Sequence, residues 1–310
     1  MKNAIEIKKL NKTYKAAGKK AEPKVALKDI DLDIPTGSIF GLLGPNGAGK
    51  STTINILAGL VLKTSGTAKI WGLDIDENPR NVKTAIGIVP QEINFDPFFT
   101  PRQLLDIQAG LYGVPKKERR TEELLEMVEL TDKAESYSRS LSGGMKRRMM
   151  VAKALAHSPP ILVLDEPTAG VDVELRQMLW ENVKRLNDEG VTIVLTTHYL
   201  EEAEALCDQI AIINHGEIVA NEDTESLLAR IDNKEIRFRM AEEIKAVPKG
   251  LEKFAVTKEG RRTLVMRYSP ADQCVGEIIE IIQKAKLDIC DISTDDSDLE
   301  DVFLQITRAA

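Results

Sequence analysis

One eight-residue segment constrains the fold of this chain more than any other part of its sequence. Residues 44–51 read Gly-Pro-Asn-Gly-Ala-Gly-Lys-Ser and match the pattern G-x-x-x-x-G-K-[ST]. The short apolar run 39–43 precedes the segment, and residues 51–58 follow it with apolar side chains at helical spacing. We therefore expect a strand, a glycine-rich loop and a helix, the context in which this pattern binds phosphate.

The residue types of this loop suit a nucleoside triphosphate. Glycines let successive backbone N–H groups point at phosphate oxygens, and the start of the helix adds its positive dipole end. Lys50 is expected to reach the β- and γ-phosphates, and the Ser51 hydroxyl to ligate Mg²⁺. The predicted nucleotide-binding residues are Gly44, Pro45, Asn46, Gly47, Ala48, Gly49, Lys50, Ser51 and Thr52. The alternative is a glycine-rich loop with an exposed lysine.

Two adjacent carboxylates, Asp165 and Glu166, follow the apolar run 161–164. Ligands of open α/β sheets bind outside the carboxyl ends of the strands. We therefore expect Asp165 to hold Mg²⁺ through its water shell and Glu166 to accept a proton from the attacking water. Two solvated acids after a strand are common, so this interpretation depends on the phosphate loop.

The remaining patterns predict an α/β fold. Strand-like runs at 85–89, 191–195 and 209–213 alternate with helical patterns at 175–186 and 201–207. Near-continuous apolar strands indicate a mostly parallel sheet that is buried on both faces. Between 101 and 157 the patterns are helical only, at 103–112, 119–128 and 144–156. We therefore expect a domain at 1–230 that contains a helical subdomain at about 92–157.

The pattern changes again after about residue 230. Strand-like alternation occurs at 236–240 and 264–268, and a helical pattern at 277–285. Ser297 and Glu300 form a capping box at the start of a last helix. We place a small accessory α+β domain at 231–310.

Composition restricts the partners and the compartment. The net charge of −7 lacks the positive field that non-specific nucleic-acid binding requires, so we expect no nucleic-acid partner. Cys207, Cys274 and Cys290 have no metal-ligand spacing and are interpreted as reduced core thiols of a cytosolic protein. No run approaches the ~20 apolar residues of a membrane span. Any membrane role is therefore expected to involve a partner.

A second phosphate-binding element is predicted at Leu141-Ser142-Gly143-Gly144-Met145, which opens a helix. Ser142 suits the N-cap, and the amides of Gly143 and Gly144 form an anion site. Leu-Ser-Gly-Gly between a phosphate loop and an Asp-Glu pair resembles the signature of the ATP-binding cassette family, over about residues 5–228. Met145 departs from the frequent Gln or Glu, with little expected loss of hydrolysis because the cradle is backbone.

The resemblance implies roles for further residues. Tyr14 is similar to the aromatic residue that stacks on adenine, with a half-buried surface tyrosine as the alternative. Gln91 resembles the glutamine that meets Mg²⁺ and the attacking water. His198 resembles the histidine that senses the γ-phosphate, with an ordinary loop histidine as the alternative. Asp172 lies in the counterpart of the loop that crosses the dimer interface.

The resemblance also implies ATP and Mg²⁺ as cofactors and a head-to-tail dimer. ATP on Lys50 of one chain is expected to be capped by Ser142 and Gly144 of a second copy or of another cassette. The C-terminal region looks like the extension of cassettes that serve ABC-2 type permeases, often exporters. The implied location is cytoplasmic and peripheral on the inner face of the cell membrane.

Two features bear on the partner. Phe95, Phe98 and Phe99 fall in one loop and are expected to contact the permease, with a small satellite core as the alternative. The basic triplet 146–148 is interpreted as a solvated face of the signature helix, with a contact to lipid head groups or to the permease as the alternative. The rival function is a non-transport cassette ATPase, of which the iron-sulfur assembly type is the hardest to exclude. A binding module without hydrolysis is disfavoured because Glu166 and His198 are both present.

Overall fold

The computed structural model describes residues 2–15, 22–168, 171, 173–230, 234–244, 247–248, 250–251, 255–268, 275–285, 287–295 and 299–309. The contacts between residues divide the chain into two units, Met1–Thr224 and Glu225–Ala309. The boundary between residues 230 and 231, which the sequence patterns place between the two domains, stays a prediction.

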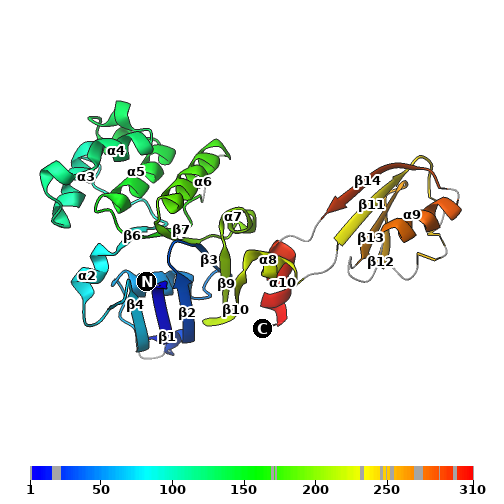
Figure 1. Cartoon of the computed structure of the whole chain (residues 1–310), viewed down its shortest axis with the longest axis horizontal. Helices are drawn as coiled ribbons and strands as arrows, with labels where there is room; N and C mark the ends of the chain where they lie inside the picture. The colour runs from blue at the N-terminus through cyan, green and yellow to red at the C-terminus, as the bar shows by residue number, and fades with distance from the viewer. Residues whose placement is uncertain are drawn as a thin grey trace. The chain divides into compact units, whose positions relative to one another are not determined.

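The larger unit is built on a six-stranded sheet with the order β10-β9-β3-β8-β7-β6 (Figure 1). The strands are β3 (Ile39–Leu43), β6 (Ile86–Val89), β7 (Ile161–Asp165), β8 (Thr192–Thr196), β9 (Gln209–Asn214) and β10 (Glu217–Asp223). All pairs are parallel except β9 with β10. Leu162 and Val163 point to opposite faces and are both fully buried, which confirms the predicted buried, mostly parallel sheet.

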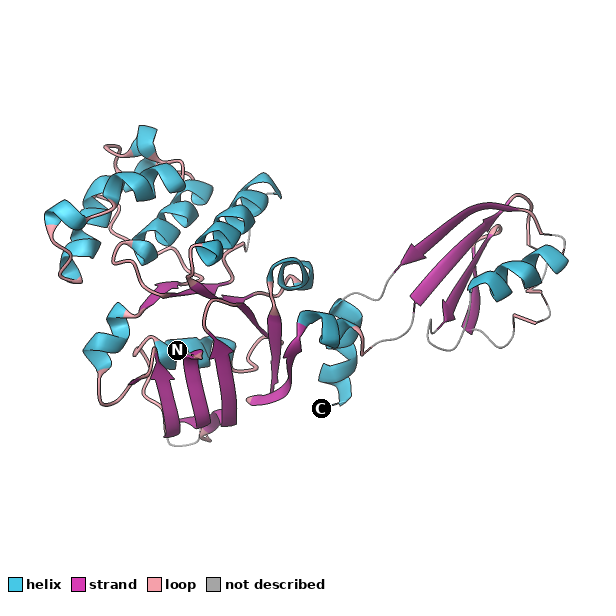
Figure 2. Ribbon diagram, in the orientation of Figure 1, coloured by secondary structure: helices cyan, strands magenta, loops and turns pink. Residues whose placement is uncertain are grey.

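A second, antiparallel sheet packs with α1 (Lys50–Leu57) against one face of the first sheet. Its order is β2-β1-β4-β5, with β1 (Asn3–Tyr14), β2 (Lys24–Pro35), β4 (Ser65–Ile70) and β5 (Leu73–Asp74) (Figure 2). Ile5 of β1, Ile54 of α1 and Phe40 of β3 belong to one buried cluster. We did not predict this sheet from the sequence, although the buried Ile30, Leu32 and Ile34 of β2 alternate with more exposed aspartates.

Helices cover the sheet and form the predicted helical subdomain. The remaining helices of this unit are α2 (Pro79–Thr84), α3 (Pro101–Leu111), α4 (Thr121–Met127), α5 (Gly143–Leu155), α6 (Val173–Asp188) and α7 (Leu200–Leu206). Helix α3 begins with a capping box in which Thr100 and Gln103 bond reciprocally. Helices α3, α4 and α5 lie together in Figure 1, and α5 carries the signature sequence.

The smaller unit contains a four-stranded antiparallel sheet with the order β12-β13-β11-β14. Its elements are α8 (Thr224–Leu228), β11 (Lys234–Met240), β12 (Ala255–Glu259), β13 (Thr263–Tyr268), α9 (Val275–Lys284), β14 (Ile289–Asp295) and α10 (Leu299–Ala309). Phe238, Met266 and Ile278 share one core, so α9 packs on this sheet. The predicted α+β character is confirmed, whereas the Ser297 capping box lies outside the described residues.

One sequence-based interpretation of the cysteines is wrong. Cys207 is a buried free thiol, and burial raises its pKa far above the ordinary value. Cys290 is also free but exposed, because it lies on strand β14 on the side away from the core, so it is not a core thiol. Cys274 lies outside the described residues.

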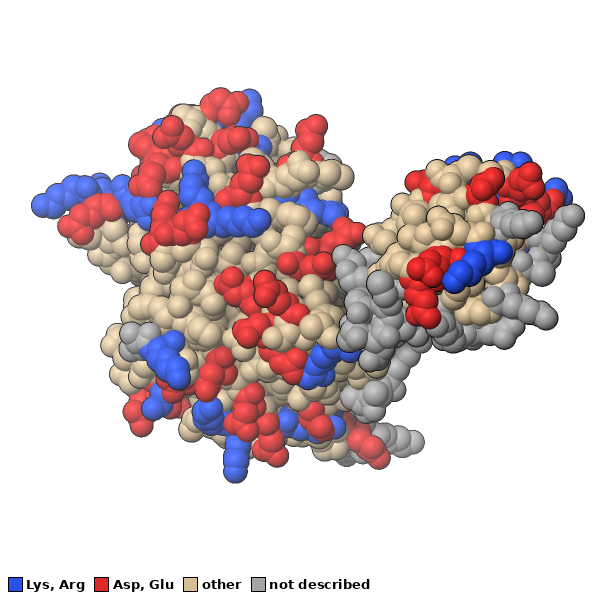
Figure 3. Space-filling view, turned by 45° about the vertical axis from the view of Figure 1, so that its right-hand side comes forward, with Lys and Arg blue, Asp and Glu red and all other residues tan. Residues whose placement is uncertain are grey.

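The surface of the larger unit carries both acidic and basic side chains. On the face in Figure 3, acidic and basic side chains are interspersed over the larger unit. Within the described ranges, no helix combines the length and the apolar character needed to cross a membrane.

Candidate nucleotide site

The glycine-rich segment forms the predicted loop between β3 and α1. Gly47 has φ 81° and Gly49 has φ 123°, left-handed conformations that favour glycine. The Lys50 Nζ atom donates hydrogen bonds to the carbonyl oxygens of Gly44 at 2.6 Å and Pro45 at 3.3 Å. The lysine is therefore folded back over the loop rather than exposed, which excludes the alternative of an exposed lysine.

A cavity of about 590 Å³ lies beside this loop. It is lined by Tyr14, Lys24, Ala26, Asn46, Gly47, Gly49, Lys50, Ser51, Thr52, Gln91, Glu166 and His198. These residues come from β1, β2, the loop, α1 and the ends of β6, β7 and β8. The fold thus brings the three predicted catalytic residues and the predicted adenine-stacking tyrosine to one cavity.

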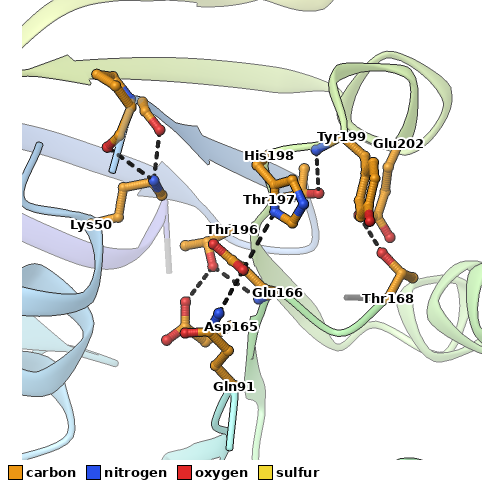
Figure 4. A network of polar contacts seen from close by, with 12 residues as sticks. Lys50, Gln91, Asp165, Glu166, Thr168, Thr196, Thr197, His198, Tyr199 and Glu202 are labelled. Atoms are coloured by element: carbon orange, nitrogen blue, oxygen red, sulfur yellow. Dashed lines mark hydrogen bonds and ion pairs between the residues drawn. The ribbon is translucent and has the colours of Figure 1, made fainter. Parts of the chain in front are cut away.

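Glu166 lies at the centre of a polar network at this cavity (Figure 4). Its Oε2 atom accepts a hydrogen bond from Gln91 Nε2 at 2.8 Å and lies 3.4 Å from His198 Nδ1. Its backbone has φ 48°, an uncommon value for a residue with a side chain. The Glu166 N–H holds this conformation by donating to the carbonyl oxygen and Oγ1 of Thr196, at 3.0 and 3.1 Å.

Asp165 and Lys50 carry charges that their protein surroundings do not fully stabilise. Burial raises the pKa of Asp165, although Oδ1 accepts a hydrogen bond from Thr196 Oγ1 at 2.5 Å. Burial likewise lowers the pKa of Lys50, although the negative charges of Glu166 and Asp165 oppose this shift. A bound cation beside Asp165 and a bound anion beside Lys50 would offset these desolvation costs.

The donor set fits Mg²⁺ better than a metal held by protein alone. Ser51 offers a hydroxyl, Asp165 a carboxylate and Gln91 an amide oxygen, which are the hard oxygen ligands that Mg²⁺ takes together with phosphate and water. Across the described residues, no group of three His, Cys, Asp or Glu side chains could hold a metal ion.

The interpretation of residues 146–148 as a solvated face is wrong for Arg147. This residue is only 5% exposed, because its position on α5 faces the ends of β6 and β7 rather than water. Its guanidinium donates hydrogen bonds to the carbonyl oxygens of Pro90, Gln91 and Glu166. No sequence pattern predicts this contact, because consecutive basic residues on a helix are usually solvated.

Sequence reasoning also missed a buried acid behind the site. Glu202 of α7 is 1% exposed and accepts hydrogen bonds from Thr168 Oγ1 and Trp180 Nε1, each at 3.0 Å. The network connects α7, which follows His198, to Thr168 after β7 (Figure 4). Through Trp180 it also connects α7 to α6. No local pattern predicts this role, because Glu202 is one of three acidic residues, with Glu201 and Glu204, in this short helix.

The signature residues lie apart from the Lys50 cavity. Ser142 is the N-cap of α5, as predicted, and its Oγ accepts a hydrogen bond from the Met145 N–H at 3.2 Å. Ser142 and Gly144 line a second cavity of about 500 Å³. A Cβ atom added to the exposed Gly143 would meet no atom of the other described residues within 4 Å, apart from the adjoining backbone of its own helix. One chain therefore does not bring these residues to its own loop. Ala169, Gly170 and Asp172 lie outside the described residues.

A phosphate loop, a paired carboxylate and a separate serine-glycine helix start together define a nucleotide-hydrolysing cassette. The family model described as ABC transporter matches residues 27–169. The chain is also 44% identical over 219 residues to the linearmycin resistance ATP-binding protein LnrL of Bacillus subtilis, covering 70% of this chain and 69% of that protein. The chain therefore belongs to the ABC transporter family, as an ATP-binding subunit that hydrolyses ATP.

Further similarities are consistent with this assignment. The Nod factor export ATP-binding protein I of Cupriavidus pinatubonensis is 40% identical over 226 residues, covering 72% of this chain and 67% of that protein. Among solved structures, the dimeric cassette MJ0796 with ADP and phosphate has a TM-score of 0.63 and 31% identity, covering 71% of this chain and 98% of that chain. Cassettes of this family dimerise and work with a permease.

Proposed function

We propose that this chain hydrolyses ATP to drive a separate ABC-2 type permease, as the motor of an exporter. The observation that carries the hydrolytic role is the Glu166 carboxylate, held by Gln91 Nε2 and facing His198 Nδ1 at the Lys50 cavity. The similarity to proteins named for Nod factor export and linearmycin resistance supports export. The proposed working place is the inner face of the cell membrane.

The proposed residue roles follow from the cavity lining. Lys50 binds the β- and γ-phosphates, and the loop N–H groups bind phosphate oxygens. Glu166 accepts the proton of the attacking water, which Gln91 orients and His198 helps to place against the γ-phosphate. Bound Mg²⁺, held through Ser51, Asp165 and Gln91, would neutralise phosphate charge. Tyr14, 37% exposed at the cavity, offers its ring to adenine.

Two chains are proposed to complete each site. Ser142, Gly143 and Gly144 are open to a second molecule, and Asp172 is proposed to lie at the same interface. The open space at Gly143 supports this role, since packing among the described residues does not require a glycine there. The dimeric cassette structures similar to this chain support a pair of like subunits.

A groove on the helical subdomain is proposed to receive a short helix of the permease. It has a volume of about 380 Å³ and is lined by residues of the turn after α1 and of α2, β6, α3 and α5, including Leu60, Met150 and Lys153. Phe98, in the loop that leads from Asn94 of this groove to α3, is 65% exposed. This exposure does not fit the alternative of a satellite core. The lysine favours an acidic residue on the partner helix.

Copurification from detergent-solubilised membranes tests the transport role. We expect the full chain to retain an integral membrane protein with the hydropathy of a permease, and Leu60→Ser, at an exposed position in the groove, to lose it. Leu111→Ser, at an exposed position of α3 outside the groove lining, is the matched control and should retain it. Recovery of the chain only in the soluble fraction, with no membrane protein, would favour the rival non-transport ATPase.

A further inference from the structure

The guanidinium of Arg147 joins three parts of the nucleotide site that lie far apart in the sequence. Nη1 donates to the carbonyl oxygens of Pro90 at 3.0 Å and Gln91 at 2.9 Å, and Nη2 donates to that of Glu166 at 3.3 Å. We propose that Arg147 is a positioning residue for ATP hydrolysis, which fixes the backbones of Gln91 and Glu166 to the signature helix α5. This inference rests on the proposed catalytic roles of those two residues.

Because Arg147 is buried, its guanidinium depends on these carbonyl oxygens for its hydrogen bonds. Burial lowers the pKa of the guanidinium, and the negative charges of Asp165 and Glu166 oppose the shift. In the described part of the chain, its hydrogen bonds go to carbonyl oxygens. A desolvated cation costs several kcal/mol unless its N–H groups find acceptors. The fixed fork of the guanidinium can reach three acceptors together, which the single ammonium of a lysine cannot do in the same geometry.

Arg147 also connects Gln91 and Glu166 to Ser142, near the start of the signature sequence. Ser142 caps α5 five residues before Arg147, which is roughly 7.5 Å along a helix axis. Met149 and Met150 on the next turn are buried, so this part of α5 is anchored in the helical subdomain. A displacement of α5 at Ser142, where the second chain's triphosphate would bind, therefore moves the group that holds Gln91 and Glu166.

Steady-state hydrolysis by the full chain tests the proposal. Arg147→Lys keeps the charge but loses the fork, so we expect kcat to fall about tenfold or more while KM for ATP stays close to the parent's, at a temperature where both proteins are fully folded. Arg102→Lys makes the same chemical change at a half-exposed arginine that pairs with Glu122 and Glu135 within the helical subdomain, and should leave kcat unchanged. Arg147→Gln serves if the lysine variant does not fold.

A double-mutant cycle separates positioning from a merely structural role. In a Gln91→Ala background, the loss of kcat caused by Arg147→Lys should be smaller than in the parent, because the group that it positions has been removed. An equal or larger loss in that background overturns the proposal, as does a parent-like kcat of Arg147→Lys. Glu166→Gln tests the underlying function separately: if that variant is inactive while Arg147→Lys is as active as the parent, only this inference fails.

Discussion

The side-chain amide of Gln91 donates a hydrogen bond to the Glu166 carboxylate, with 2.8 Å between Nε2 and Oε2. The two residues follow adjacent parallel strands, β6 and β7, so the sheet itself sets their separation. A loop residue at the start of the helical subdomain is thereby in contact with the proposed base.

Glu166→Gln should abolish ATP turnover but leave ATP binding intact. The new amide keeps an oxygen that can accept from Gln91, so the geometry is retained while the proton acceptor is lost. We expect a fall in phosphate release of about 10²–10⁴-fold. Light scattering with ATP and Mg²⁺ should show an accumulated dimer. Parent-like phosphate release would falsify the assignment of Glu166 as the base.

Lys50→Met should weaken ATP binding while preserving the size of the side chain. The triphosphate loses a charge-assisted hydrogen bond, worth about 1.5–3 kcal/mol, so Kd should rise about tenfold to a hundredfold. Equilibrium titration with a fluorescent ATP analogue measures this change. Lys24→Met, a change at an exposed lysine on the cavity rim, is the control, and equal affinities of the two variants would exclude a direct phosphate contact of Lys50.

Asp165→Asn should stabilise the nucleotide-free protein at neutral pH. Burial raises the pKa of Asp165 above its ordinary value, so the folded state favours the neutral form. The stability that this preference contributes is present below the ordinary pKa and is lost as the pH rises through the raised value. The variant should therefore unfold at a higher temperature than the parent at pH 7, with the difference shrinking as the pH falls toward 4. An unfolding temperature of the variant below that of the parent at pH 7 would contradict the predicted stabilisation.

Gly143→Ala and Gly87→Ala should have opposite effects. A Cβ at Gly143 meets open space and favours helix α5, so the single chain should keep or gain stability, by up to about 0.5 kcal/mol, yet lose turnover. A Cβ at Gly87 would lie 2.4 Å from the Ala154 carbonyl oxygen, so this variant should be destabilised by about 1–3 kcal/mol. Thermal unfolding and ATPase assays compare the two. Full turnover by Gly143→Ala would argue against close approach of a second chain's phosphate.

Glu202→Gln should destabilise the cassette. The carboxylate accepts from both Thr168 and Trp180, and an amide offers only one acceptor oxygen, so one donor is left unpaired at a cost of about 1–3 kcal/mol. Glu201→Gln, at an exposed position on the same helix, should change stability by less than about 0.5 kcal/mol. Equal urea midpoints for the two variants would show that the buried network contributes little.

Local patterns predicted much of the fold and of the site. The strands β3 and β7 are apolar runs, the first followed by the glycine-rich loop and the second ending at Asp165, so both the elements and the ligand edge could be recognised. The Ser142 N-cap is also a local signal, because the cap and its Met145 partner lie within one turn.

Other features depend on contacts between distant segments. Arg147 and Glu202 look like ordinary charged helix residues until the fold buries them against β6, β7 and α6. Thr196 is one residue of an apolar strand, and its bond to Asp165 exists only because β7 and β8 are parallel neighbours in register. Predicting such roles requires the register between neighbouring strands. The spacing of apolar residues along one strand does not reveal that register.

The outward-facing serine at the start of α5 has a kinetic consequence. If each chain holds two different halves of a reaction centre, the rate per chain depends on how often two chains meet, and purified protein should lose specific activity on dilution. A membrane partner that holds two copies together would fix their effective concentration, on the order of millimolar for short tethers. ATP turnover would then no longer fall on dilution, and the permease would control the rate of hydrolysis by the subunits that drive it.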